Sequence, residues 1–410
     1  MQSALPAGAT LLGMILSSDK TTITSLTGNC IAHPLLISLA NLHMNMRSKL
    51  LTNSFVLTVL LPVLKFVQKK KCMKGVLQDC LIHQFLDLIL RLLKQAAKHG
   101  IMLSDPIGRS RYCFTTLASY IVDMPEAMML LTVGGKTSPV TMVMYMQFGD
   151  SFWHEPRTRS TTLAQLAVVC SRADPNDLEA HFCEAQKFHL NGVDKPFWSD
   201  WIFADPSYFL TPETLHHIHK EFYNHDAQWL IVSVGESEIN FHFSVLQPIT
   251  SFQHFHEGIL KLKQVTVSVD AVPPSVLAAV CVLMQFRYLV QLPRIDENNL
   301  KLISGALDEF HVKKDMIITA GARCGQHNNS IVPSIHNSGV TSQWTADITE
   351  HITEIKDPAR SSNNINYDPQ ICRHLNRADK CRRFELAINL LDCDQSLQDV
   401  DIDPKDNVDT

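Results

Sequence analysis

The sequence predicts an α/β fold in which a sheet-forming first third is followed by a long, mostly helical region. Short apolar runs bounded by polar turn residues fill residues 10–67, a pattern typical of strands. Residues 75–99 instead carry apolar side chains at spacings of three and four, which is typical of an amphipathic helix. From residue 161 to residue 317 the sequence is helical in character.

The first two predicted strands, residues 11–16 and 35–40, flank a polar, turn-rich segment at 20–29. Asp19 follows the first strand, so its carboxylate would project from a rigid sheet edge. Catalytic and metal-binding carboxylates are usefully held in such a place. The alternative is that Asp19 only opens a turn.

Extended chain and one long helix follow. Residues 54–67 are apolar and divided by Pro62, so we expect a strand that passes into a helix. A lysine-rich run then leads into the helix at 75–99, which should end near Gly100.

A hairpin and a second acidic residue complete the first third. The segment 105–108 (Asp-Pro-Ile-Gly) predicts a turn between extended segments at 101–105 and 111–114. Another apolar run, 117–122, ends at Asp123, and a helix can begin just after it. Asp19 and Asp123 can meet only if their two strands are neighbours in the sheet.

The rest of the chain is predicted to be loop, helices and a polar end. Residues 134–152 are rich in glycine, serine and proline and should form a loop. Helical patterns cover residues 161–170, 177–189, 215–225, 276–290, 300–317 and 379–391. The acidic end, 392–410, is predicted to be disordered.

Composition limits the class of protein. The 410 residues, 45% apolar and 19% charged, can bury the core of one large domain or two smaller ones. No apolar run reaches the length needed to cross a bilayer, so we expect a soluble protein without a membrane partner. Eleven cysteines without a CxxC pair argue against disulfides and four-cysteine zinc sites, and favour a nuclear or cytoplasmic location.

Charge argues mildly against a free-standing DNA-binding domain. The net charge is −5, whereas such domains are usually strongly basic. The positive charge is local, and each patch could meet phosphates or simply form a solvated helix face. The patches contain Lys65, Lys69, Lys70, Lys71 and Lys74, then Arg157 and Arg159, then Arg377, Lys380, Arg382 and Arg383.

Several stretches together resemble one family, the Plavaka-type transposases of fungi, relatives of the CACTA DNA transposons. The stretches occur in the family's order and span roughly residues 11–388. They include SSDKTTITSLTGNCIAHPLLISLANLHMNMR, CMKGVLQDCLIHQFLDLIL, GIMLSDPIGRSRYCFTTLASYIVDMPEAMML, GGKTSPVTMVMYMQFGDSFWHEPRTRSTTLAQL and HITEIKDPARSSNNINYDPQICRHLNRADKCRRFELA.

The resemblance implies an RNase H-like mixed-sheet core interrupted by a large, mostly α-helical insertion. Residues 1–135 would form the first part of the core, and 136–335 the loop and helical insertion. Residues 336–391 would return to the core with a third acid, ahead of the acidic tail at 392–410.

The resemblance also implies a catalytic and metal-binding triad of Asp19, Asp123 and Glu350, with Glu354, one helical turn on, as the alternative third acid. Two-metal phosphoryl transfer needs carboxylates that hold Mg²⁺ or Mn²⁺. The expected substrate is DNA at transposon ends, cleaved and transferred by a protein that could act as a homo-oligomer.

The sequence also departs from the family pattern, and these departures leave a second function open. The chain begins just before the first catalytic strand, so we expect an upstream DNA-binding region to be missing. Segments 264–276 and 325–338 look shortened, and no CxxC motif follows the second acid. The alternative to an enzyme is a truncated or domesticated remnant without catalytic activity, which at most binds DNA or protein.

Overall fold

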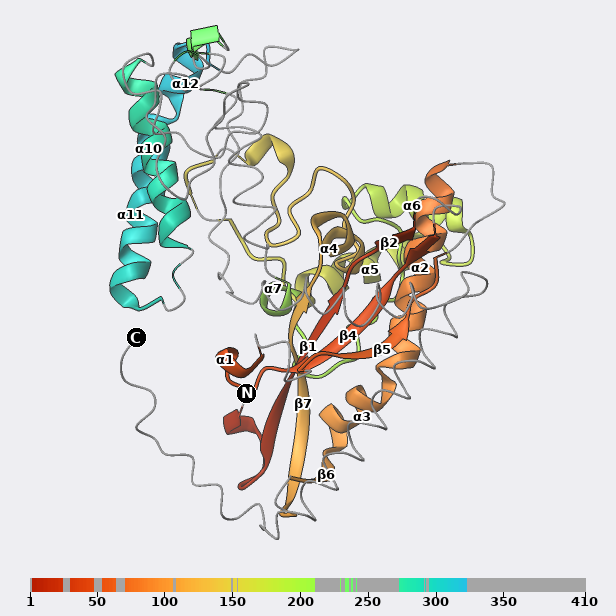
Figure 1. Ribbon diagram of the computed structural model, residues 1–410. Coiled ribbons are helices and arrows are strands. Elements are labelled where there is room, and N and C mark those ends of the chain that lie inside the picture. Colours follow the sequence, from red (N-terminus) through yellow and green to blue (C-terminus); the bar gives the residue numbers. More distant parts are fainter. Residues whose placement is uncertain are drawn as a thin grey trace, which may run out of the picture.

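The structure is a computed structural model that describes most of residues 2–210 and 273–322. Short gaps in these ranges lie at 25–29, 48–53, 64–70, 106–107, 149, 153, 291 and 293–294, and a few residues between 229 and 241 are also described. The α/β class predicted from the sequence is confirmed: a five-stranded mixed sheet is flanked by helices (Figure 1).

The sheet has the strand order β5-β4-β1-β7-β6. β1 pairs antiparallel with β4 and parallel with β7, while β4–β5 and β6–β7 are antiparallel pairs. The strands are β1 (Thr10–Ser18), β4 (Pro34–Leu39), β5 (Val56–Leu60), β6 (Ile101–Ser104) and β7 (Ser110–Ile121).

Two parts of the sheet differ from the sequence prediction. The segments 111–114 and 117–122 belong to one continuous strand, β7, because the polar residues between them are satisfied within the structure. The hydroxyl of Thr115 donates to the Leu93 carbonyl (2.5 Å), and that of Thr116 donates to the Phe203 carbonyl (2.8 Å). The turn-rich segment after Asp19 also contains strand, in a small antiparallel ladder of β2 (Thr21–Thr24) with β3 (Cys30–Ala32).

The predicted long helix is divided in two. α2 (Lys71–Ile89) and α3 (Arg91–His99) meet at Leu90, whose backbone (φ −87°, ψ 4°) departs from helical values although it keeps its hydrogen bonds to Leu86 and Lys94. Gly100 ends α3 as predicted, with a φ of 70° that favours glycine. A Cβ at Gly100 would lie 2.5 Å from the Tyr112 ring, so space as well as conformation requires glycine here.

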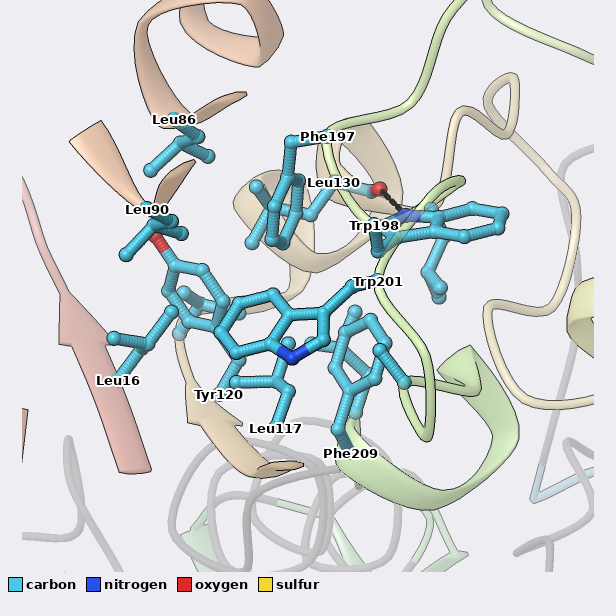
Figure 2. Packing of buried hydrophobic residues seen from close by; sticks show 14 of the residues in the cluster. Leu16, Leu86, Leu90, Leu117, Tyr120, Leu130, Phe197, Trp198, Trp201 and Phe209 are labelled. Carbon is cyan, nitrogen blue, oxygen red and sulfur yellow. Dashed lines mark hydrogen bonds between the residues drawn. The ribbon is translucent and has the colours of Figure 1, made fainter. Parts of the chain in front are cut away.

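Side chains on one face of the sheet form the main core with α2, α3 and aromatic residues from farther along the chain. Alternate strand residues point to opposite faces; thus Leu16 and Tyr120 enter this core, whereas Ile15 and Ile121 belong to a smaller cluster with Leu36 and Phe55. Figure 2 shows the aromatic residues Phe197, Trp198, Trp201 and Phe209 beside Leu16, Leu117 and Tyr120 of the strands and Leu86 and Leu90 of the helices.

Phe197, Trp198 and Trp201 come after three helices, α4 (Met124–Leu130), α5 (Arg159–Arg172) and α6 (Leu178–Gln186), and Phe209 is the last residue of a fourth, α7 (Pro206–Phe209). The other short elements in this part of the chain are η1 (Gln2–Ala4), α1 (Met44–Arg47) and η3 (Tyr145–Gln147). The Trp198 indole N–H donates to the Leu130 carbonyl at the end of α4 (2.8 Å), so the buried polar atom of this tryptophan is satisfied. Residues between 136 and 210 therefore complete the core of the sheet.

A second cluster of buried side chains lies between α10 (Pro274–Leu289), α11 (Glu297–Lys313) and α12 (Asp315–Thr319). These helices confirm the helical prediction for 276–290 and 300–317, although the second segment is divided at Lys314. In the parts of the chain described, no helix is long and apolar enough to span a membrane. The predicted helices at 215–225 and 379–391 lie outside the described residues.

We expect Trp201→Ala to lower the free energy of unfolding by about 3–5 kcal/mol, the usual cost of truncating a buried tryptophan. The Trp201 side chain is fully buried in the core, so truncation would leave a cavity against the sheet. Urea unfolding followed by circular dichroism measures the change. Tyr208→Ala is the matched control, because Tyr208 is aromatic and near in sequence but 72% exposed. Equal effects of the two substitutions would contradict this packing.

Candidate active site

Asp19 and Asp123 lie at the same edge of the sheet. Each follows one of two neighbouring parallel strands: Asp19 comes after β1 and Asp123 after β7. Ser17 is paired with Ile121, so each acid stands two residues beyond this pair. Asp19 is exposed and Asp123 half-buried. The two acids can meet only if their strands are neighbours in the sheet, and the pairing of β1 with β7 meets this condition.

Asp123 also begins a helix. It is the N-cap of α4, with an extended backbone (φ −71°, ψ 166°), and its Oδ1 accepts the Glu126 backbone N–H at 2.9 Å. Pro125, in the first turn, suits a helix start because its missing N–H is not needed there. The cap fixes the direction of the Asp123 side chain, and such caps typically contribute about 1 kcal/mol.

A buried polar cluster lies directly behind the two acids. Glu126 Oε1 accepts the Ser18 hydroxyl at 2.6 Å and lies 2.9 Å from His33 Nε2. Ser18 Oγ is also 3.1 Å from Tyr120 Oη. Ser18, His33 and Tyr120 are each 1% exposed and Glu126 is 8% exposed. Burial, with a smaller contribution from the Glu126 carboxylate, raises the pKa of Tyr120, so its hydroxyl stays protonated.

Sequence reasoning did not identify this polar cluster. Two signals point to it in retrospect: Glu126 is the single charged residue in the otherwise apolar segment MPEAMML, and His33 interrupts an apolar stretch ahead of β4. A charge within an apolar helix is costly to bury unless it is paired. Neither signal names the partner, because Ser18 and Glu126 are 108 residues apart in the chain.

A cleft of about 500 Å³ opens beside the first turn of α4. Pro125 forms part of its wall, and Asp79 of α2 and Asn191 supply polar groups. Asn191 Nδ2 donates to Asp79 Oδ2 at 3.0 Å. Burial raises the pKa of Asp79 to about 6, although the Asn191 hydrogen bond and the positive charge of Lys20 act in the opposite direction. The positive charge of Lys20, the residue after Asp19, thus favours the ionised form of the Asp79 carboxyl in this cleft.

Two of the three predicted acids can be placed. Carboxylates are the ligands that Mg²⁺ and Mn²⁺ prefer, so Asp19 and Asp123 suit such an ion in kind. In the part of the chain that the structure describes, no group of three His, Cys, Asp or Glu side chains is arranged to hold a metal ion. Glu350 and Glu354 lie outside the described residues, so the third ligand stays a prediction.

Arg157 is buried, so neither of the two alternatives left open for it, a phosphate contact or a solvated helix face, applies. It is 1% exposed, and its Nε donates to the Ser138 carbonyl at 3.2 Å. Burial lowers the pKa of Arg157 to about 10. Neighbouring Arg159 donates from Nη2 to the Ser199 carbonyl (2.6 Å). Lys74 is exposed, whereas Lys65, Lys69, Lys70 and the cluster at 377–383 lie outside the described residues.

Comparison with known proteins gives one family. A family model described as Plavaka transposase matches residues 1–230, more than half of the 410-residue chain. The match includes both acids, the polar cluster behind them and the aromatic residues of the core. No curated protein matches the chain.

We expect Asp79→Asn to remove a pH-dependent cost to folding. Because the folded-state pKa of Asp79 lies above its ordinary value of 3.8, the native state binds more protons than the unfolded state between about pH 4 and pH 6, and stability falls as the pH rises through this window. Relative to the wild type, the variant should gain up to about 3 kcal/mol in free energy of unfolding between pH 4 and pH 7, at 1.36 kcal/mol per pKa unit.

Urea unfolding of both proteins across this pH range measures the difference. The matched control is Asp308→Asn, at an exposed position of α11, which should leave the pH profile unchanged. A pH-independent difference between Asp79→Asn and the wild type would show that the Asp79 carboxyl is not raised in pKa.

Proposed function

We propose, because this chain belongs to the Plavaka transposase family, that its sheet is an RNase H-like catalytic core that cleaves DNA and transfers strands at transposon ends. The protein is transposase-derived. The proposal concerns its chemistry: metal-dependent phosphoryl transfer by Asp19 and Asp123 together with a third acid, Glu350 or Glu354.

One observation carries the proposal: β1 and β7 are parallel neighbours, and an acid follows each at the same sheet edge. In addition, β1, β4 and β5 form an antiparallel set and β7 joins β1 in parallel from the other side, so the sheet is mixed. Two carboxylates at the ends of neighbouring strands, from distant parts of the chain, would provide a rigid starting point for a catalytic site.

The protein's own residues would bind and orient the reacting groups. Asp19 is exposed, so its carboxylate is accessible to a DNA phosphate with its metal ions. Asp123 is half-buried, and its cap to the Glu126 N–H restricts its rotamers. When bound, divalent ions activate the attacking oxygen and neutralise charge on the leaving oxygen. The chain contributes fixed carboxylates, which reduce the reorganisation needed when charge develops in the transition state.

We expect purified protein to nick labelled transposon-end DNA in the presence of Mg²⁺ or Mn²⁺ and to lose this activity with a chelator. Asp19→Asn and Asp123→Asn should each lower the nicking rate by about a hundredfold or more, because each removes a carboxylate that would hold the metal ions on which transition-state stabilisation depends. Asparagine is also a good N-cap residue, so Asp123→Asn should keep the start of α4.

Asp308→Asn, an exposed Asp-to-Asn change in α11, is the control for the loss of a negative charge elsewhere. Circular dichroism and thermal unfolding of all variants establish that they are folded. Folded wild type that does not nick DNA would contradict the proposal and support a remnant without catalytic activity. DNA binding would then be the next property to measure.

A further inference from the structure

Glu126 is bonded to both strand ends that carry the acids. Its backbone N–H donates to Asp123 Oδ1 at 2.9 Å. Its side chain accepts, through Oε1, the hydroxyl of Ser18 at 2.6 Å. Ser18 is the last residue of β1 and directly precedes Asp19. A single residue of α4 therefore connects the position of one acid to that of the other.

The side-chain contacts of Glu126 also join a third segment, just ahead of β4. His33 Nε2 lies 2.9 Å from Glu126 Oε1, within hydrogen-bond distance. His33 Nδ1 is buried, and among the residues described it has no hydrogen-bond partner. Oε1 thus contacts side chains from two different segments, so Ser18 of β1, His33 just before β4 and Glu126 of α4 are held in one arrangement.

Because this polar cluster is buried, it costs more free energy than an apolar cluster of the same size would, so packing alone does not explain it. The Glu126 side chain is only 7% exposed, and removing a carboxyl group from water is costly unless hydrogen bonds compensate. An apolar residue at this position could fill the same space without that cost. The contacts give something that packing alone does not: directional bonds to the two strand ends.

From this arrangement we propose that Glu126 is a positioning residue, which sets the relative placement of the Asp19 and Asp123 carboxylates. This inference rests on the proposed function of the two acids. Glu126 acts through Ser18 on one side and through the Asp123 cap on the other. It is not itself assigned as a metal ligand, because its Oε1 is already in hydrogen-bond contact with Ser18 and His33.

The expected effect follows from how strictly catalytic groups must be placed. Hydrogen-bond partners that orient metal ligands typically contribute about tenfold to a hundredfold in metal affinity or activity. Loss of the Ser18–Glu126 bond would leave the end of β1 without its link to α4, held by its sheet pairing and by the contact of Ser18 with Tyr120. The fold should survive, but the two carboxylates should lose their fixed separation.

The test uses three variants of the full chain: Glu126→Met, Ser18→Ala and the double substitution. Glu126→Met keeps an unbranched side chain of similar length but removes the oxygen that accepts the Ser18 hydroxyl. Ser18→Ala removes one hydroxyl and leaves the Glu126–His33 contact, so it serves if Glu126→Met does not fold. Glu184→Met is the matched control, since Glu184 is a partly buried glutamate of α6 that pairs with Lys187.

Three measurements distinguish positioning from general stability. Hydrogen exchange should increase locally in peptides that contain Ser18–Asp19 and Asp123, whereas global destabilisation would increase it throughout. The Mn²⁺ affinity is measured by electron paramagnetic resonance, with Asp19→Asn as the baseline for Mn²⁺ bound elsewhere. It should fall by about tenfold to a hundredfold, and the nicking rate should fall similarly. The double variant should lose less Mn²⁺ affinity and nicking activity than the two single effects added together, because Glu126→Met and Ser18→Ala both remove the Ser18–Glu126 hydrogen bond.

The two proposals can fail separately. Folded variants with wild-type Mn²⁺ affinity, local exchange and nicking rate would overturn the role of Glu126 while leaving the proposed function intact. Wild type that neither binds Mn²⁺ through Asp19 nor nicks DNA would refute the proposed function, and the positioning role would fall with it. An additive double variant would show that Ser18 and Glu126 act independently, against the proposed connection.

Discussion

The parallel pairing of β1 with β7 is the constraint on which the rest of the structure depends. It places Ser17 opposite Ile121, so the two strands end together and Asp19 and Asp123 leave the sheet at one edge. It also brings the Ser18 hydroxyl next to that of Tyr120, close to the following helix, where Glu126 accepts the Ser18 hydroxyl. Because side chains alternate along a strand, a one-residue shift in the β1–β7 register would move the side chains of the main core to the opposite face of the sheet, and those of the smaller cluster into the core.

The core that supports this pairing is assembled from distant segments. α2 and α3 supply Leu86, Leu90 and their neighbours, but the aromatic residues at 197–209 supply the bulk on the same face (Figure 2). The Trp198 indole fixes this segment to the end of α4, whose beginning carries Asp123. The acids, the first turn of α4 and the aromatic cover are therefore parts of one packed unit, and helices placed after the first third of the chain contribute to it.

Local signals predicted much of this fold. The apolar runs located β1 and β4, the Asp-Pro-Ile-Gly turn located the β6–β7 hairpin, and Gly100 located the end of α3. The failures have a common physical origin, which is that polar groups found partners far away in the chain. Thr115 and Thr116 looked like a break between strands because their carbonyl partners, at Leu93 and Phe203, could not be inferred locally.

The same limit applies to the candidate site. The sequence could point to Asp19 and Asp123, each at the exit of an apolar run, but their shared edge required knowledge of which strands pair. Glu126 and His33 could be seen only as unusual residues in apolar surroundings. Both alternatives for Arg157 placed it at the surface because it is basic, whereas its side chain is buried and donates to the Ser138 carbonyl.

The distance in sequence between paired residues also affects the order in which the protein can form. Ser18 and Tyr120 are 102 residues apart, so β1 cannot pair with β7 until the chain between them has been synthesised. The loss of chain entropy on closing such a loop comes before the contacts that compensate for it. During synthesis on the ribosome, this face of the sheet can be covered by α2 and α3 but lacks its aromatic cover until Trp201 and Phe209 have left the exit tunnel. The nascent chain thus exposes apolar surface of the kind to which chaperones bind.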